Sequence, residues 1–259
     1  MACQHLRSTS LPVRLHALVQ EVEDELQRIR SGASASAPSL AGRLGDAYGR
    51  IEELVRLHGG RDALSSARWR SAVEAELDAS VALLDLCQRA RDAVASAKQH
   101  VRAARRAVRR GDAVLARAAV RGYVRCLAKA GKHEAGGRKL LSKRGAPANA
   151  DGTPAAVKTL SEAVAVTVAV LQCVLSSLSM RVVDTRRKSR WCVVSKLLGS
   201  EWSLGLGVCK DLEGHEGAMS AQETLQELED GIEAVESGLE HLFRHIVQAR
   251  VGLLNVLTL

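Results

Sequence analysis

The sequence predicts an all-α protein: an elongated bundle of about six helices whose long third and last helices pack antiparallel. Three observations carry this prediction. Aliphatic residues recur at helical spacing along most of the 259 residues. Proline occurs only four times, and the aromatic residues are two Tyr, three Trp and one Phe, so the core must be aliphatic and helical. Basic and acidic residues are concentrated in different helices, which favours pairing those helices with each other.

The predicted domain organisation is a flexible leader over residues 1–13 and a single helical-bundle domain over residues 14–259. The first twenty residues contain bases and hydroxyls but no acids, as in an organelle transit peptide, yet they lack the apolar core of a secretory signal. A disordered leader that runs into the first helix is the simpler interpretation. The six cysteines never form a CxxC pair, which argues against a zinc module or a disulfide framework and favours a reducing compartment.

The first two helices are predicted to form a helical hairpin. The first spans residues 15–30, and its apolar face is Leu15, Leu18, Val22, Leu26 and Ile29. The SGASASAPS segment ends it, and Pro38 lies just inside the second helix, where proline is favoured. The apolar face of the second helix is Leu40, Leu44, Tyr48, Ile51, Leu54 and Val55.

The third helix is predicted from Ala67 to Arg110, because no Gly or Pro interrupts this stretch. At 1.5 Å per residue it would be roughly 65 Å long. Its first apolar face is Trp69, Val73, Leu77, Val81, Leu84 and Cys87. Its second half continues with small residues at Cys87, Ala90, Val94, Ala97, Val101, Ala104 and Val108, which allow a neighbouring helix to approach closely.

A fourth helix is predicted from an N-cap at Asp112 to about Ala130, with fraying through Gly131 and Gly136. A loop follows near residues 143–155. The fifth helix is predicted over residues 155–180. Its stretch from 163 to 180 has no charged residue, which reaches the lower limit for a membrane span. Because Thr and Ser dilute that stretch, a buried central helix is the preferred interpretation and a membrane anchor is the alternative.

The last helix is predicted over residues 219–258, after a loop near 199–218. Its packing seam alternates gaps of three and four residues at Leu225, Leu228, Ile232, Val235, Leu239, Leu242, Ile246, Ala249, Leu253 and Val256. Apolar residues also flank the seam at Phe243, Val247, Leu254 and Leu257. A face this wide favours packing within one bundle over a two-stranded coiled coil, and a homo-oligomer is the alternative.

The charge distribution predicts how the third and last helices pair. Residues 88–144 hold seventeen Lys and Arg and three acids, a net +14, so the rest of this +8 chain carries −6. The bases at the end of the third helix are Lys98, Arg102, Arg105, Arg106, Arg109 and Arg110. The acids at the start of the last helix are Glu223, Glu227, Glu229, Asp230, Glu233, Glu236 and Glu240. Antiparallel packing brings the two sets together.

One basic stripe has no acidic counterpart in this pattern. It lies on the fourth helix at Arg117, Arg121, Arg125, Lys129 and Lys132. A solvated face is one interpretation, and a surface for an anionic partner, such as a lipid headgroup or a nucleic acid, is the other. The low aromatic content disfavours nucleic acid, since single strands are bound by stacking their bases on aromatic rings.

No motif of catalysis or cofactor binding is present: the sequence lacks a nucleotide-binding glycine loop, an HExxH and a nucleophile elbow. We therefore expect no enzymatic activity, no cofactor and no metal. His241 and His245 are four residues apart, but no third ligand is indicated. The basic run from Arg186 to Arg190 is a candidate nuclear-import signal or, at Ser189, a candidate phosphorylation site, where phosphate would cancel much of the local positive charge.

Several strings resemble the plant BYPASS-like family, a family with a domain of unknown function. They are RSTSLP at residues 7–12, HALVQEVEDEL at 16–26, LLDLCQRARD at 83–92, SEAVAVTVAVLQCVLSSLS at 161–179, RWCVVSKLL at 190–198 and LEDGIEAVESGLEHLFRHIVQARVGLLN at 228–255. The resemblance implies a role in root and shoot development through control of a mobile root-derived signal. It supplies no catalytic residues.

Two functional hypotheses follow. The first is a cytoplasmic helical regulatory protein that binds an unidentified protein partner. The second is a membrane-associated protein, anchored by residues 163–180 or held at an anionic lipid surface by the basic stripe. The nucleus, through the basic run, and the plastid, through the leader, are alternative locations.

Overall fold

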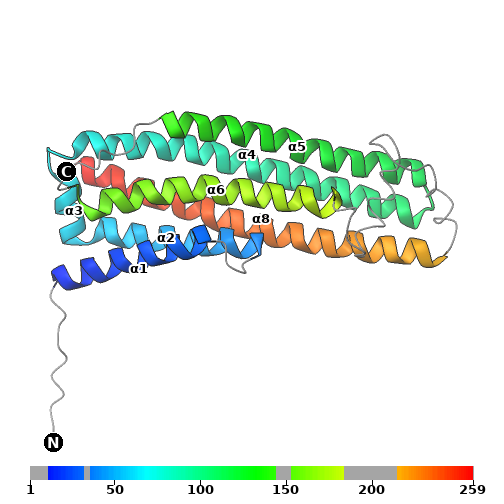
Figure 1. Cartoon of the computed structure of the whole chain (residues 1–259), viewed down its shortest axis with the longest axis horizontal. Coiled ribbons are helices and arrows are strands. Elements are labelled where there is room, and N and C mark those ends of the chain that lie inside the picture. The colour runs from blue at the N-terminus through cyan, green and yellow to red at the C-terminus, as the bar shows by residue number, and fades with distance from the viewer. Residues whose placement is uncertain (1–10, 32–35, 144–152, 184–214, 259) are drawn as a thin grey trace, which may run out of the picture.

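The computed structural model describes residues 11–31, 36–143, 153–183 and 215–258. The helices within them are α1 (Leu11–Ser31), α2 (Ala37–Arg56), α3 (His58–Ser65), α4 (Arg70–Arg109), α5 (Ala113–Lys143), α6 (Ala155–Val183) and α8 (His215–Leu257). No strand occurs in these residues, and the predicted all-α class is confirmed. Figure 1 shows an elongated bundle in which the long helices follow the long axis and α3 lies at one end.

Several predicted boundaries are corrected by the structure. Residues 11–13, assigned to the leader, belong to α1, and residues 215–218, assigned to a loop, belong to α8. The prediction that the fourth helix frays near Gly131 is wrong, because α5 continues to Lys143. Glycine weakens a helix by about 1 kcal/mol relative to alanine but does not forbid one, and no proline occurs between Ala113 and Pro147. The rest of the predicted leader and loops lies outside the described residues.

The short helix α3 was not predicted from the sequence. Two glycines in its first turn give it a weak helical signal. It is positioned by packing: Leu64 is completely buried, and Gly60 faces the carbonyl of Leu54 so closely that an added Cβ would lie 2.1 Å from that oxygen. The tertiary structure therefore stabilises a helix that local propensity does not favour.

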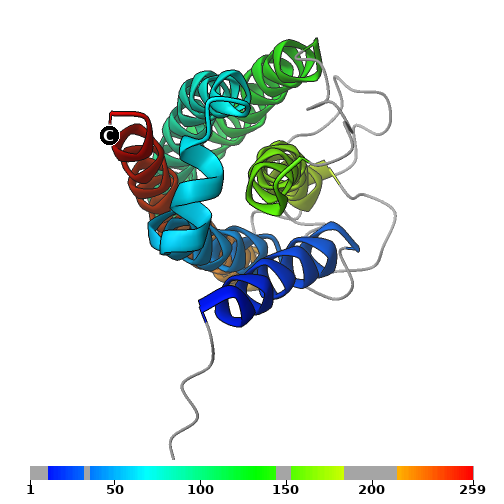
Figure 2. The same ribbon diagram turned by 90° about the vertical axis from the view of Figure 1, so that its left-hand side faces the viewer.

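Helix α6 occupies the centre of the bundle and contacts α1, α2, α4 and α5. The end-on view in Figure 2 shows it between the pair α4–α5 and the pair α1–α2. Thr167 is fully buried, and its hydroxyl donates to the carbonyl of Ala163 at 2.7 Å and accepts from Tyr48 at 3.1 Å. These bonds satisfy the polar group, so the threonine can be accommodated in an apolar core.

A tight turn joins α4 to α5 and confirms the predicted N-cap. Gly111 has φ +70°, and the amides of Gly111 and Asp112 bond to the carbonyls of Val108 and Ala107, the pattern of a Schellman cap. Asp112 Oδ1 then accepts the amide of Leu115 at 2.9 Å, as an N-cap residue does. The turn sets α5 antiparallel against α4 along its outer side (Figure 1).

Helices α2 and α8 run parallel and approach closely through glycines. Gly238 of α8 faces α2, where an added Cβ would lie 3.0 Å from the carbonyl oxygen of Pro38. Gly45 and Gly49 of α2 lie opposite His241 and His245. Residue numbers increase in the same direction along the contact in both helices, so α2 and α8 are parallel. Residue spacing alone does not predict this contact, because it depends on glycines.

Candidate anionic-partner surface

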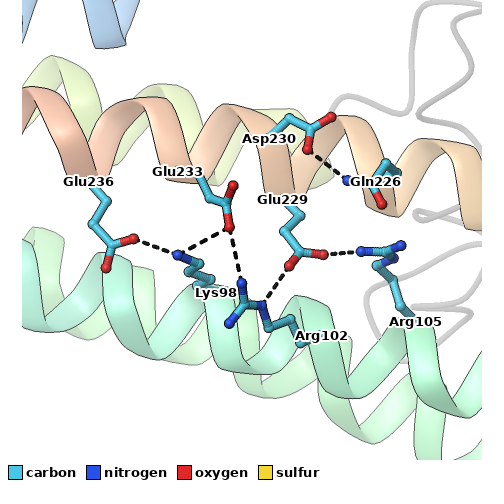
Figure 3. Close-up of polar contacts among 8 residues, drawn as sticks. All are labelled: Lys98, Arg102, Arg105, Gln226, Glu229, Asp230, Glu233 and Glu236. Atoms are coloured by element: carbon cyan, nitrogen blue, oxygen red, sulfur yellow. Dashed lines mark hydrogen bonds and ion pairs between the residues drawn. The ribbon is translucent and has the colours of Figure 1, made fainter.

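The pairing of α4 with α8 determines which basic residues of the protein are already neutralised. Arg91 donates to Glu240, and Lys98 bonds to Glu236 at 2.7 Å and to Glu233 at 3.2 Å. Further along, Arg102 bonds to Glu229 at 2.6 Å and to Glu233 at 3.0 Å, and Arg105 donates to Glu229. Figure 3 shows the part of this ladder formed by Lys98, Arg102 and Arg105 with the glutamates of α8. Residue numbers rise along α4 as they fall along α8, so the predicted antiparallel packing is confirmed.

Glu229 is the central acceptor of this ladder. Its side chain is only 8 % exposed and receives hydrogen bonds from two guanidinium groups. Burial opposes ionisation of the carboxyl, but the bonds from Arg102 and Arg105 outweigh that effect and hold its pKa below the usual range. The same pairing raises the pKa of Lys98, chiefly through its hydrogen bond to Glu236. Both shifts favour the charged forms of Glu229 and Lys98 near neutral pH.

The basic stripe of α5 is in a different environment. Arg121, Arg125, Lys129 and Lys132 are all exposed, and among the described side chains no carboxylate lies within ion-pair distance of them. Arg117 differs from these four because it is half-buried and its Nε donates to the carbonyl of Ala113 at 3.1 Å. In Figure 1, α5 lies along one outer edge of the bundle. We call the four exposed residues the α5 basic face.

Most of the predicted apolar residues of α8 lie in the core, but two predicted apolar residues are exposed. The ten predicted seam residues of α8 are all buried in the core: Leu225, Leu228, Ile232, Val235, Leu239, Leu242, Ile246, Ala249, Leu253 and Val256. Of the flanking residues, Phe243, Val247 and Leu257 are half-buried, whereas Leu254 is 40 % exposed, contrary to the wide face predicted. Val81, assigned to the apolar face of the third helix, is also exposed, at 45 %. Ser189 lies outside the described residues.

The histidine pair of α8 lies against α2. His241 Nε2 is 2.9 Å from Asp46 Oδ1, and the rings of His241 and His245 meet edge to face with centroids 4.6 Å apart. His245 faces Gly49, whose missing side chain leaves room for the ring. Within the described residues, no group of three or more His, Cys, Asp or Glu is arranged to hold a metal ion. The pair therefore serves as part of the α2–α8 contact.

This contact makes the stability of the protein depend on pH. Burial, followed by the neighbouring His241, lowers the pKa of His245 below its ordinary value of 6.5, while Glu52 and Asp46 act in the opposite direction and Arg244 adds to the lowering. As pH falls below about 6.5, the unfolded chain binds a proton at this residue before the folded chain does, so stability decreases. We expect the melting temperature to fall between about pH 7.5 and 5.5, and less steeply for His245→Gln.

Melting curves across that range test the expectation, with His58→Gln, at an exposed histidine of α3, as the control. The control should retain the slope of the unmodified protein. An identical pH dependence in His245→Gln would contradict the assignment.

A small hollow lies between α4, α5 and α8. It is lined by His100, Val101, Ala104, Val120, Tyr123, Leu225 and Leu228, and its volume is about 10 Å³. That space admits about one water molecule. His100 partly fills the region because Gly122, opposite it on α5, carries no side chain. The hollow is too small for a substrate or a cofactor.

The fold and this surface define a class: an all-α bundle in which four bases of one long helix, Arg91, Lys98, Arg102 and Arg105, pair with acids of α8, while a second basic helix faces solvent. Within that class the chain belongs to the family described as Protein BPS1, whose model matches residues 41–256, from the second turn of α2 to the last turn of α8. The BYPASS-like resemblance is thereby confirmed. No curated protein matches the chain, and no solved structure matches it.

Proposed function

We propose that this protein is a non-enzymatic helical regulatory protein of plant root and shoot development, acting on a mobile root-derived signal, and that the α5 basic face binds an anionic partner. Membership of the BPS1 family suggests a role in plant development. The observation that carries the binding proposal is the contrast between two basic helices. The bases of α4 that face α8 are matched by acids, whereas those of the α5 basic face are exposed and have no carboxylate within ion-pair distance among the side chains that the structure describes.

The spacing of the α5 basic face supports a binding role. Arg121, Arg125, Lys129 and Lys132 follow one another at steps of four, four and three, so they cover roughly 16 Å of one helix face. Like charges at this spacing destabilise a helix by a few tenths of a kcal/mol per pair. An acidic protein surface or an anionic lipid headgroup layer would remove that repulsion, and the rigid helix holds the charges in a fixed array.

Two observations support the non-enzymatic part of the proposal. The sequence carries no motif of catalysis, and the hollow lined by His100 and Tyr123 has room for about one water molecule. A protein of this kind acts through its surface. A cytoplasmic location is consistent with the scattered cysteines, since Cys87, Cys126 and Cys173 are free thiols in the structure.

Peripheral binding to membranes is the second candidate. Val114 and Leu115, in the first turn of α5, are 74 % and 45 % exposed and lie about two turns before Arg121, where the α5 basic face begins. Apolar residues beside a row of bases are typical of helices that lie on an anionic membrane. A spanning helix receives less support. Residues 155–179 of α6 have the length and apolarity of a span, with mean hydropathy 1.7, but 56 % of that window is buried inside the bundle.

A matched pair of variants tests the proposal. Arg121→Glu with Arg125→Glu reverses two charges of the α5 basic face, and Arg61→Glu with Arg89→Glu makes the same change at exposed positions of α3 and α4. We expect the α5 variant to lose at least about tenfold in binding, measured by proximity labelling of partners in plant tissue and by sedimentation with vesicles containing phosphatidylserine. The control variant should bind normally.

The vesicle arm separates the two candidates. A protein partner is supported if the α5 variant loses labelled proteins and the unmodified protein does not bind vesicles. The peripheral membrane role is supported if the unmodified protein binds vesicles and salt weakens that binding. Melting temperatures show whether both variants are folded. Equal binding by the two variants would refute a role for the α5 basic face, and resistance to carbonate extraction would replace the proposal by a membrane anchor.

A further inference from the structure

The α4–α8 pair carries an exposed apolar surface that the bundle does not use. The exposed large hydrophobic residues of the described part include Val81 of α4 and Val251 and Leu254 of α8, at 45 %, 49 % and 40 %. The half-buried Leu84 and Val247 belong to the same region. We call these five residues the α4–α8 apolar face. In the end-on view of Figure 2, α4 and α8 lie side by side and their outer side carries no other long helix.

The register of the ion ladder places these residues together. Arg250 Nη1 donates to the carbonyl of Leu77 and to Ser80 Oγ, the latter at 2.6 Å, so the turn around residue 80 adjoins the turn around residue 250. Leu84 is seven residues before Arg91, and Val247 is seven after Glu240, which puts them on the same helix faces as that ion pair. The outer groove between α4 and α8 is thus ionic along one half and apolar along the other.

Charges of opposite sign border the two sides of the apolar half. Residues 241–259 contain no Asp or Glu, and α8 exposes Arg244 there. On α4 the exposed charged residues from position 74 to position 89 are Glu74, Asp78, Asp85 and Arg89, three acids and one base, so this side carries net negative charge. A partner whose charges complement this groove must therefore place mainly bases opposite α4 and acids opposite α8.

A second copy of this chain meets that requirement, and we propose that two chains associate through the α4–α8 apolar face. A twofold axis parallel to the helices puts α4 of one protomer opposite α8 of the other. The apolar residues then face each other, and Asp85 of each protomer lies on the same side and at the same level as Arg244 of the other. An axis perpendicular to the helices would instead put acid against acid, so the charges select the first arrangement.

The expected dimer is weak. The apolar half of the groove is about 24 Å long and two helices wide, roughly 500 Å² per protomer, which is at the low end for specific interfaces. We therefore expect a dissociation constant on the order of micromolar, with reversible exchange of protomers. This inference is independent of the α5 basic face, because the two surfaces share no residue.

Sedimentation velocity of the full chain from roughly 1 to 100 µM tests the dimer. Val251→Glu with Leu254→Glu should raise the dissociation constant at least about tenfold, whereas Val114→Glu with Leu115→Glu, the same change at exposed residues of α5, should leave it unchanged. A chain that stays monomeric at every concentration would overturn the proposal, and so would equal dimerisation by the two variants.

A charge exchange then identifies the occupant as a second copy. Asp85→Arg and Arg244→Asp should each weaken the dimer several-fold, and the chain that carries both should recover most of the loss, since each new base again meets a new acid across the twofold axis. Additive weakening in the double variant would exclude this arrangement. Binding of a different protein to the groove by an otherwise monomeric chain would also overturn it.

Discussion

Replacing Glu229 by lysine is expected to lower the free energy of unfolding by about 3 kcal/mol, because it removes the shared acceptor of two arginines and adds a third positive charge among them. The Glu229 side chain is 8 % exposed, and Arg105, which donates to it, is 18 % exposed. Removing one partner of a buried ion pair leaves the other charge desolvated and unmatched, which costs about 3–5 kcal/mol. We place the loss at the low end because Arg102 is half-exposed and can turn toward water.

Glu233→Lys is the matched control, since it makes the same substitution one helical turn further along the same ladder. Glu233 is 47 % exposed, and exposed ion pairs contribute about 1 kcal/mol or less. Urea denaturation of both variants measures the difference. Equal losses would show that burial does not determine the strength of the ladder and would contradict the central role of Glu229.

Truncating Leu239 to alanine is expected to destabilise the protein by about 3 kcal/mol, within the 2–5 kcal/mol found for buried leucines. Leu239 is completely buried on the α8 seam. It lies next to Gly238, where α8 approaches α2 so closely that relaxation of the backbone around the cavity is restricted. A domain is typically stable by 5–15 kcal/mol, so the loss should be visible as a large shift of the denaturation midpoint.

Leu115→Ala provides the comparison for this prediction because it removes the same atoms from a side chain that is 45 % exposed. We expect it to change the free energy of unfolding by no more than about 0.5 kcal/mol. If Leu239→Ala were equally mild, the α8 seam would not be the packing centre of the bundle.

The helical elements could be predicted well because their signals are local. Apolar spacing of three and four places α1, α2, α4, α6 and α8 with boundary errors of a few residues. The two exceptions have a common cause. Glycine carries no apolar signal and a low helix propensity, so the spacing argument missed α3 and shortened α5. Both helices exist because glycine only disfavours a helix, by an amount that neighbouring contacts can exceed.

The antiparallel α4–α8 pair could be predicted because charge is a signal that acts between helices. The parallel α2–α8 pair could not, since it depends on close approach at Gly45 and Gly238, where what matters is the absence of a side chain. Nor could spacing predict that Val81 and Leu254 would remain exposed. Periodicity shows which residues share an apolar face, but it does not show how many other helices pack against that face.

The α5 basic face was visible in the sequence as a row of bases. The sequence by itself therefore determined the all-α class, the pairing of opposite charges along α4 and α8, and the candidate surface on α5. The tertiary structure alone decided which bases are neutralised, which apolar residues stay exposed, and how α2, α6 and α8 meet. The physical reason is that spacing along a chain specifies the face of one helix, whereas burial and neutralisation depend on what packs against that face.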